Sequence, residues 1–238
     1  MVKEELVKRS PLRILEQSTH GGLVPGSIGV IASRKGVGKT ACLVHIATDS
    51  LLQGKHVIHV SFSGKTDHII SWYEDIFKEI ATWQNLEGAM DVHDELIKRR
   101  VIMNFNQEGT DFSQVLQSLR AMISDGGFEA DMIVIDGLDI ALLETPTMDL
   151  LHNFAKELGV SVWFSATVGR DDADPDERGV PAMLQSIVDD LSVVITLTPD
   201  QDRYVHLKLI KDHETFPGGR DLHLRLDSST MLIAADTK

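Results

Sequence analysis

The sequence has a single cysteine, few aromatic residues and no long apolar run. Cys42 has no second cysteine to pair with, so an internal disulfide is excluded and a reducing compartment is expected. No apolar run approaches the ~20 residues that a membrane helix needs, so no membrane span is expected. The opening segment MVKEELVKRSPLRILEQ is charged throughout and carries no apolar stretch of the kind found in secretory signals. These absences predict a cytoplasmic protein.

Positive charge is also scarce. The 23 Lys and Arg residues face 36 Asp and Glu residues, which gives a formal net charge of −13. An acidic surface repels both phosphate backbones and anionic lipid, so the composition argues against a nucleic-acid or membrane partner. The 42% of hydrophobic residues is ample for a core and excludes a disordered chain.

Short apolar runs alternate with amphipathic stretches, which is typical of a parallel sheet flanked by helices. The predicted buried strands are Ser27–Ser33, His56–Phe62, Val101–Phe105, Asp131–Asp136 and Val160–Ala166. Helical spacing is predicted at residues 38–52, 67–83, 91–98, 112–123 and 148–158. Three late segments, LSVVITL, YVHLKLI and LHLRL, alternate in a way that predicts an antiparallel extension of the sheet. We therefore expect one α/β domain over residues 1–238, with residues 1–20 as an N-terminal extension.

The segment SRKGVGKT, Ser33–Thr40, lies between a predicted strand and a predicted helix. It fits the phosphate-loop pattern G-x-x-x-x-G-K-[ST] except at its first position, where Ser33 replaces glycine. Small residues such as Gly36 and Gly38 let successive backbone N–H groups curl around phosphates. The following helix N-terminus adds partial positive charge. The segment predicts a binding site for a nucleoside triphosphate.

Each residue type in this pattern has a chemical role. Lys39 is expected to bridge the β- and γ-phosphates, and the Thr40 hydroxyl to bind Mg²⁺. Asp136 ends the apolar strand MIVID, where its carboxylate can hold Mg²⁺ through a water. The residues predicted to bind the nucleotide are Ser33, Arg34, Lys35, Gly36, Val37, Gly38, Lys39, Thr40, Ala41 and Asp136. No Asn/Thr-Lys-x-Asp motif for guanine is present, which favours ATP over GTP.

The run GGLVPGSIGVIASRKGVGKTACLVHIA, Gly21–Ala47, resembles the RecA-like P-loop ATPases, above all their KaiC-like and DnaB-type helicase branch. The strand DMIVIDGLD and the late segment KLIKDHETFPGG extend the resemblance along residues 21–226. The resemblance implies a RecA-like domain that binds ATP and Mg²⁺. It also implies a homo-oligomer, such as a hexameric ring, with nucleotide held between subunits.

Several positions depart from the family's pattern. Relatives carry a catalytic Glu just after the second strand, where Ser63 and Gly64 stand in this sequence. Asp67 and Glu74 are the nearby carboxylates that could replace it, although neither matches the motif. A positioned acid–base group contributes about 10²–10⁴-fold in rate, so hydrolysis is expected to be slow or absent.

Two further departures concern assembly and nucleic acid. Relatives place a Lys-x-Arg pair on a late strand, reaching the neighbouring subunit's nucleotide; here the pair is Lys211 and His213. A neutral His stabilises phosphate charge less well than Arg, which weakens this contact in trans. The loop GRDDADPDERG, where relatives often contact DNA, carries a net charge of −3 and should repel a phosphate backbone.

These observations predict an Mg·ATP-binding switch or assembly factor with weak ATPase activity and an unidentified protein partner. The alternative is an active ATPase motor on single-stranded DNA, like the helicases and recombinases that the sequence resembles. Ten histidines are present, but no HExxH, CxxC or His-rich tract accompanies them, so the sequence predicts no histidine metal site.

Overall fold

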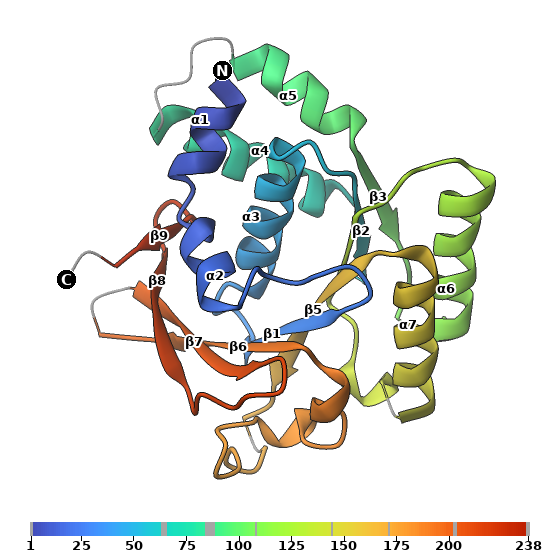
Figure 1. Cartoon of the computed structure of the whole chain (residues 1–238), viewed down its shortest axis with the longest axis vertical. Coiled ribbons are helices and arrows are strands. Elements are labelled where there is room, and N and C mark those ends of the chain that lie inside the picture. Colours follow the sequence, from blue (N-terminus) through green and yellow to red (C-terminus); the bar gives the residue numbers. More distant parts are fainter. Residues whose placement is uncertain are drawn as a thin grey trace.

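The computed structural model describes residues 2–62, 66–83, 89–107, 109–143, 145–170, 172–201 and 204–236. Its strands form one nine-stranded sheet in the order β3-β2-β4-β5-β1-β6-β7-β8-β9 (Figure 1). The pairs from β3 to β6 are parallel and those from β6 to β9 are antiparallel. This confirms the predicted α/β class with a mostly parallel central sheet and antiparallel C-terminal strands. The strands are β1 Ile28–Arg34, β2 Val57–Ser61, β3 Arg100–Asn104, β4 Met132–Asp136, β5 Ser161–Val168, β6 Val193–Pro199, β7 Tyr204–Asp212, β8 Arg220–Asp227 and β9 Ile233–Ala235.

Helices cover both faces of the sheet and enclose two apolar cores (Figure 1). One core lies under α1 Val2–Arg9, α2 Leu12–Ser18, α3 Lys39–Leu52, α4 Thr66–Trp83 and α5 Ala89–Lys98. The other lies under α6 Phe112–Arg120, its π-helical continuation η1 Ala121–Asp125, α7 Thr145–Leu158 and the 3₁₀ turns η2 Ile140–Leu142, η3 Ala182–Leu184 and η4 Val188–Asp190. Because both faces are covered, the central parallel strands are continuous apolar runs rather than alternating ones. No described helix has the length and apolarity that crossing a membrane requires.

Helix α3 is the central helix of the first core. Every residue from Ala41 to Leu52 is buried, because α3 is enclosed by the sheet, α1, α2 and α4 (Figure 1). A helix that is apolar nearly all round is stable only when it is enclosed in this way. Its first turn, Lys39 and Thr40, is thereby fixed beside the carboxyl ends of β1 and β4.

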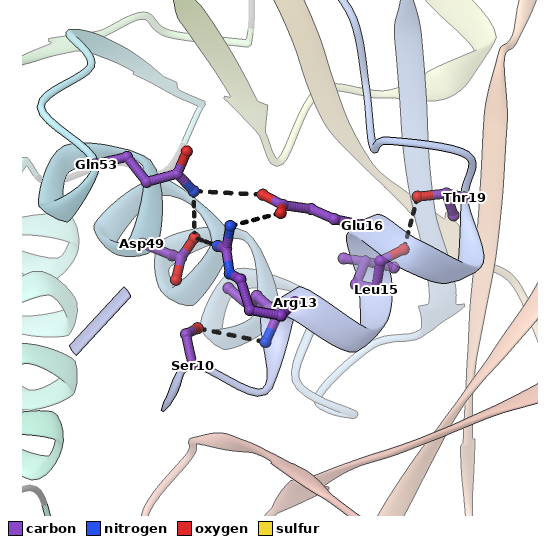
Figure 2. Close-up of polar contacts among 8 residues, drawn as sticks. Ser10, Arg13, Leu15, Glu16, Thr19, Asp49 and Gln53 are labelled. Atoms are coloured by element: carbon purple, nitrogen blue, oxygen red, sulfur yellow. Dashed lines mark hydrogen bonds and ion pairs between the residues drawn. The ribbon is translucent and has the colours of Figure 1, made fainter. Parts of the chain in front are cut away.

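The N-terminal extension expected at residues 1–20 forms α1 and α2, which pack on α3. Leu12 and Leu15 of α2 are buried in the first core. The Arg13 guanidinium binds the buried carboxylate of Asp49 and, at 2.5 Å, the carboxylate of Glu16 (Figure 2). Gln53 Nε2 donates to the same Asp49 carboxylate at 2.7 Å. This network fixes α2 against the C-terminal half of α3.

Candidate functional site

The loop between β1 and α3 has the backbone that phosphate binding needs. Gly36 and Gly38 have φ values of +81° and +122°, a region that other residues rarely adopt. A Cβ on Gly38 would also lie 2.3 Å from Leu226 Cδ2, so the Leu226 side chain would have to move. Ser33, which replaces the first glycine of the pattern, lies within β1 and is not among the residues with positive φ. Serine is therefore accommodated there without backbone strain.

Lys39 and Thr40 begin α3 directly beneath this loop. Lys39 Nζ donates to the carbonyl oxygens of Ser33 at 3.0 Å and Arg34 at 3.1 Å. The Thr40 hydroxyl donates to Asp136 Oδ2 at 2.8 Å, although the two residues are 96 positions apart. Burial lowers the pKa of Lys39, and the nearby Asp136 carboxylate partly opposes that shift. The structure thus brings a lysine, a hydroxyl and a carboxylate together at one edge of the sheet.

A cavity of about 500 Å³ opens over these three side chains. This volume lies within the range of small-molecule sites, about 300–1,000 Å³. Ser165 lies at its floor and accepts a hydrogen bond from the Gly137 N–H at 2.9 Å. The lining residues are Lys35, Gly36, Gly38, Lys39, Thr40, Ala41, Phe62, His68, Ile69, Trp72, Asp136, Gly137, Ser165, Thr167 and Met231.

Eight of these lining residues lie outside the set predicted to bind the nucleotide: Phe62, His68, Ile69, Trp72, Gly137, Ser165, Thr167 and Met231. His68 and Trp72 come from the first turns of α4, and their rings contact edge to face with centroids 6.1 Å apart. Met231 comes from the turn between β8 and β9, and Ser165 from β5. No motif marks His68, Trp72 or Met231, because α4 and the turn between β8 and β9 reach the cavity only through tertiary packing.

The two carboxylates proposed to replace the catalytic Glu do not line the cavity. Asp67 is exposed at the start of α4. Glu74 is two turns further along and accepts a hydrogen bond from His93 Nε2 at 2.5 Å, with Arg100 Nη2 3.9 Å away. Ser63 and Gly64 lie outside the described residues. Among the described residues, Asp136 is the only carboxylate that lines the cavity.

Lys211, predicted to reach a neighbouring subunit, is bound within its own chain. Its ammonium donates to the carbonyls of Val188 at 2.6 Å and Asp189 at 3.2 Å, and only 4% of the residue is exposed. Burial lowers the pKa of this lysine as well. His213 Nδ1 lies 2.9 Å from Asp212 Oδ1. A contact in trans would require Lys211 to leave these carbonyls, and for both residues it stays a prediction.

In the acidic loop that follows β5, carboxylates accept hydrogen bonds from backbone N–H groups of the same loop. Asp172 accepts from the Gly169 N–H, and Asp176 accepts from the backbone N–H groups of Arg178 and Val180. Asp171 lies outside the described residues. These carboxylates order the loop in the structure, and they keep its surface negative.

No protein-family model matches the chain, and no curated protein matches it. A function for this protein is therefore inferred from its own residues. The strongest concentration of functional groups in the described structure is the cavity over Lys39, Thr40 and Asp136, where flexible backbone, a cation and a carboxylate meet.

Proposed function

We propose that this protein binds Mg·ATP in the cavity at Ser33–Ala41 and acts as a nucleotide-dependent switch or assembly factor. In this proposal the fold is RecA-like, and hydrolysis is weak or absent. One observation carries it: the Thr40 hydroxyl lies 2.8 Å from Asp136, beside a buried lysine at the edge of an open cavity.

The donor set suits the phosphates and their metal ion. The N–H groups of the glycine-containing loop and the α3 N-terminus favour anions. Lys39 now donates to two carbonyls at the end of β1, and phosphate oxygens would be stronger, charged acceptors in their place. The Thr40 hydroxyl and the Asp136 carboxylate are the hard oxygen ligands that Mg²⁺ prefers. Bound Mg²⁺ would neutralise phosphate charge there.

Weak hydrolysis follows from what the cavity offers to a water molecule. Asp136 already accepts from Thr40 and faces the metal position, so it is poorly placed to activate the attacking water. The segment Ser63–Lys65, which follows β2, contains no carboxylate in its sequence. Among the described residues no carboxylate other than Asp136 lines the cavity, so no second Asp or Glu is present there to activate the water.

A switch requires that bound nucleotide contact an element able to transmit a change. Helix α4 provides this element, since His68, Ile69 and Trp72 form one wall of the cavity. The same helix extends 18 residues to Trp83, which is 63% exposed. If bound nucleotide alters the packing of the first turns of α4, the surface at the C-terminal end of α4, near Trp83, would move. We propose this surface as the one presented to a partner or to a second copy of the chain.

The test measures binding and turnover separately. Mg·ATP is titrated into the wild-type chain by calorimetry, with Lys39→Ala as the site variant and Lys98→Ala as a control. Lys98 is an exposed lysine at the end of α5, away from the cavity. We expect saturable 1:1 binding to the wild type and the control and a large loss in Lys39→Ala. GTP is titrated in parallel to establish base preference.

Phosphate release from Mg·ATP is then followed with and without single-stranded DNA, with Lys39→Ala as the blank. We expect turnover near the blank and no stimulation by DNA. Equal ATP affinity in Lys39→Ala and wild type would refute the binding site. Turnover that rises with DNA would refute the switch and establish the motor alternative.

A further inference from the structure

Three side chains from distant parts of the sequence meet on the antiparallel half of the molecule. His20 lies in the turn after α2, Asp212 ends β7, and His213 follows it. His20 Nδ1 is 2.6 Å from Asp212 Oδ2, and His213 Nδ1 is 2.9 Å from Asp212 Oδ1. One ligand atom from each residue lies within 4.8 Å of the others. Both imidazoles therefore face one carboxylate, one at each oxygen.

The carboxylate at the centre is nearly inaccessible to solvent. Asp212 has a side-chain exposure of 3%, and no lysine or arginine among the described residues pairs with it. A buried carboxylate is unfavourable unless cations or several hydrogen bonds compensate its charge. Two imidazoles supply a single N–H each when neutral, which leaves this negative charge without a full counter-charge.

The backbone is also held in an uncommon conformation at both histidines. His20 has φ +49° and His213 has φ +51°, in the left-handed region that non-glycine residues visit infrequently. Surrounding contacts fix each one: Arg220 Nη2 donates to the Ser18 carbonyl at 2.8 Å, and the His213 N–H donates to the Ser192 carbonyl at 2.5 Å. Such conformations persist where the neighbouring structure imposes them, and they concentrate at functional sites.

The cluster is separate from the nucleotide cavity. Asp212 pairs with Val193 of β6, and Val193 pairs with Gly29 near the start of β1. The phosphate loop, by contrast, follows the last residue of β1. The two sets of residues therefore lie at opposite ends of the same central strand, and a ligand at one does not contact the other.

We propose that His20, Asp212 and His213 bind one divalent transition-metal ion, with Zn²⁺ as the preferred ion. Two imidazole nitrogens and one carboxylate oxygen form a ligand set that suits zinc and leaves a fourth position for water. The ion supplies the positive charge that the buried Asp212 lacks. It also joins the turn after α2 to the end of β7, so that α2 is held to the C-terminal strands.

The side chains must shift to accept the ion, because the two imidazole nitrogens contact different oxygens of Asp212 and the ligand atoms lie up to 4.8 Å apart. Ligand atoms around tetrahedral zinc are about 3.3 Å apart, given Zn–N and Zn–O distances near 2.0 Å. The N–O distances of 2.6 and 2.9 Å must therefore widen by about half an ångström. His20, whose side chain is 77% exposed, is free to make that movement. Binding requires the lone pair of each Nδ1, so each neutral imidazole carries its N–H on Nε2 when the ion is bound.

The test titrates Zn²⁺ into the untagged full chain by calorimetry, with excess Mg²⁺ present to saturate hard-oxygen sites. The site variants are His20→Ala and His213→Ala. The control is His223→Ala, because His223 is also left-handed, at φ +54°, but is exposed and outside the cluster. We expect one Zn²⁺ per chain for wild type and control, and affinity reduced about tenfold or more in both site variants.

A second measurement does not depend on the stability of the alanine variants. Co²⁺ is added to His20→Cys, which replaces one proposed imidazole ligand with a thiolate. We expect a sulfur-to-cobalt charge-transfer absorption band that wild type lacks. The native Cys42 serves as an internal control, because it is buried and its pKa is raised to about 12.

Zinc should also raise the midpoint of thermal unfolding of the wild type more than that of His20→Ala, because the stabilisation by a ligand grows with its affinity for the folded state. Equal zinc affinity in wild type, His20→Ala and His213→Ala would overturn the proposal. Absence of the charge-transfer band in Co²⁺-loaded His20→Cys would also overturn it. Mg·ATP binding should be the same in His20→Ala as in wild type, so the outcome is independent of the nucleotide site.

Discussion

Two buried lysines occupy similar local environments and yet differ in what they can do. Lys39 and Lys211 each donate to two backbone carbonyls, each is more than nine-tenths buried, and each has its pKa lowered by that burial. The carbonyls at Lys39 belong to the last two residues of β1, Ser33 and Arg34, and Lys39 itself lines an open cavity. Those at Lys211 belong to the 3₁₀ turn η4, and the Phe216 ring lies over the ammonium at 5.5 Å.

The difference shows that burial and hydrogen bonding alone do not identify a binding lysine. At Lys39 a ligand can enter and replace the carbonyl oxygens as acceptors. Lys211 lines none of the described cavities, and its ammonium ties η4 to β7 through the Val188 and Asp189 carbonyls. Free volume beside the charge separates a residue that binds a ligand from one that holds the fold together.

The largest expected effect is on nucleotide affinity. Replacing Lys39 with alanine should weaken Mg·ATP binding by about 100-fold or more, because a charge-assisted contact to phosphate is lost inside a partly desolvated site. Lys211→Met should bind Mg·ATP as the wild type does. Calorimetric titration of both variants checks this, and a matching loss in Lys211→Met would show that the two lysines are not separable.

The next prediction concerns the free energy of unfolding, to which Lys211 should contribute. Lys211→Met keeps the length of the side chain but leaves the Val188 and Asp189 carbonyls without their donor, which should lower the free energy of unfolding by about 2 kcal/mol. Urea denaturation measures this loss. Lys208→Met, on the same strand and half-buried, is the control and should change stability by less than about 0.5 kcal/mol. Similar losses in the two variants would contradict a structural role specific to Lys211.

A third prediction concerns the Asp136 carboxylate, which lines the same cavity as Lys39. Asp136→Asn keeps a neutral acceptor for the Thr40 hydroxyl and removes the negative charge that would hold Mg²⁺. ATP affinity in the presence of Mg²⁺ should fall about tenfold, a magnitude typical when support for a metal ion is weakened. ATP affinity with the metal chelated should not fall. Equal losses with and without Mg²⁺ would remove Asp136 from the metal site.

The smallest effect is the dependence of stability on alkaline pH. Burial lowers the folded-state pKa of Lys211 below its ordinary 10.5, so between those two values the unfolded chain binds more protons than the folded chain. Stability attributable to this residue therefore rises with pH in that window, by at most about 1.4 kcal/mol per pH unit. Denaturation of wild type and Lys211→Met across the window measures the difference, and a wild-type curve that falls relative to the variant would contradict the sign.

ATP affinity, in contrast, should fall as the pH rises toward 10.5, because Lys39 loses its charge. Its pKa is also lowered, and the neutral amine binds phosphate poorly, so affinity declines at a lower pH than for an ordinary lysine. ATP titrations at increasing pH follow this change. Affinity that stays constant up to pH 10.5 would show that the Lys39 charge does not contribute to binding.

Much of the parallel half could be predicted from the sequence. The strand predicted at Ser27–Ser33 is β1 at Ile28–Arg34, and the one at Asp131–Asp136 is β4 at Met132–Asp136. The meeting of Thr40 and Asp136 also follows from the pattern, because carboxyl ends of parallel strands share one edge of a sheet. The prediction did not include α1, α2 and β9, which are short segments of eight, seven and three residues.

The sequence by itself determined the class of fold, the antiparallel C-terminal strands and the glycine-containing turn between β1 and α3, because each depends on local spacing of apolar and glycine residues. Only the tertiary structure decided which lysine faces a cavity, that Glu74 pairs with His93 rather than entering the site, and that His20 lies against Asp212. These outcomes depend on packing between elements far apart in the chain, where no local periodicity carries a signal. The sequence could therefore place Lys39 in a motif, but only packing could enclose Lys211 among its own carbonyls.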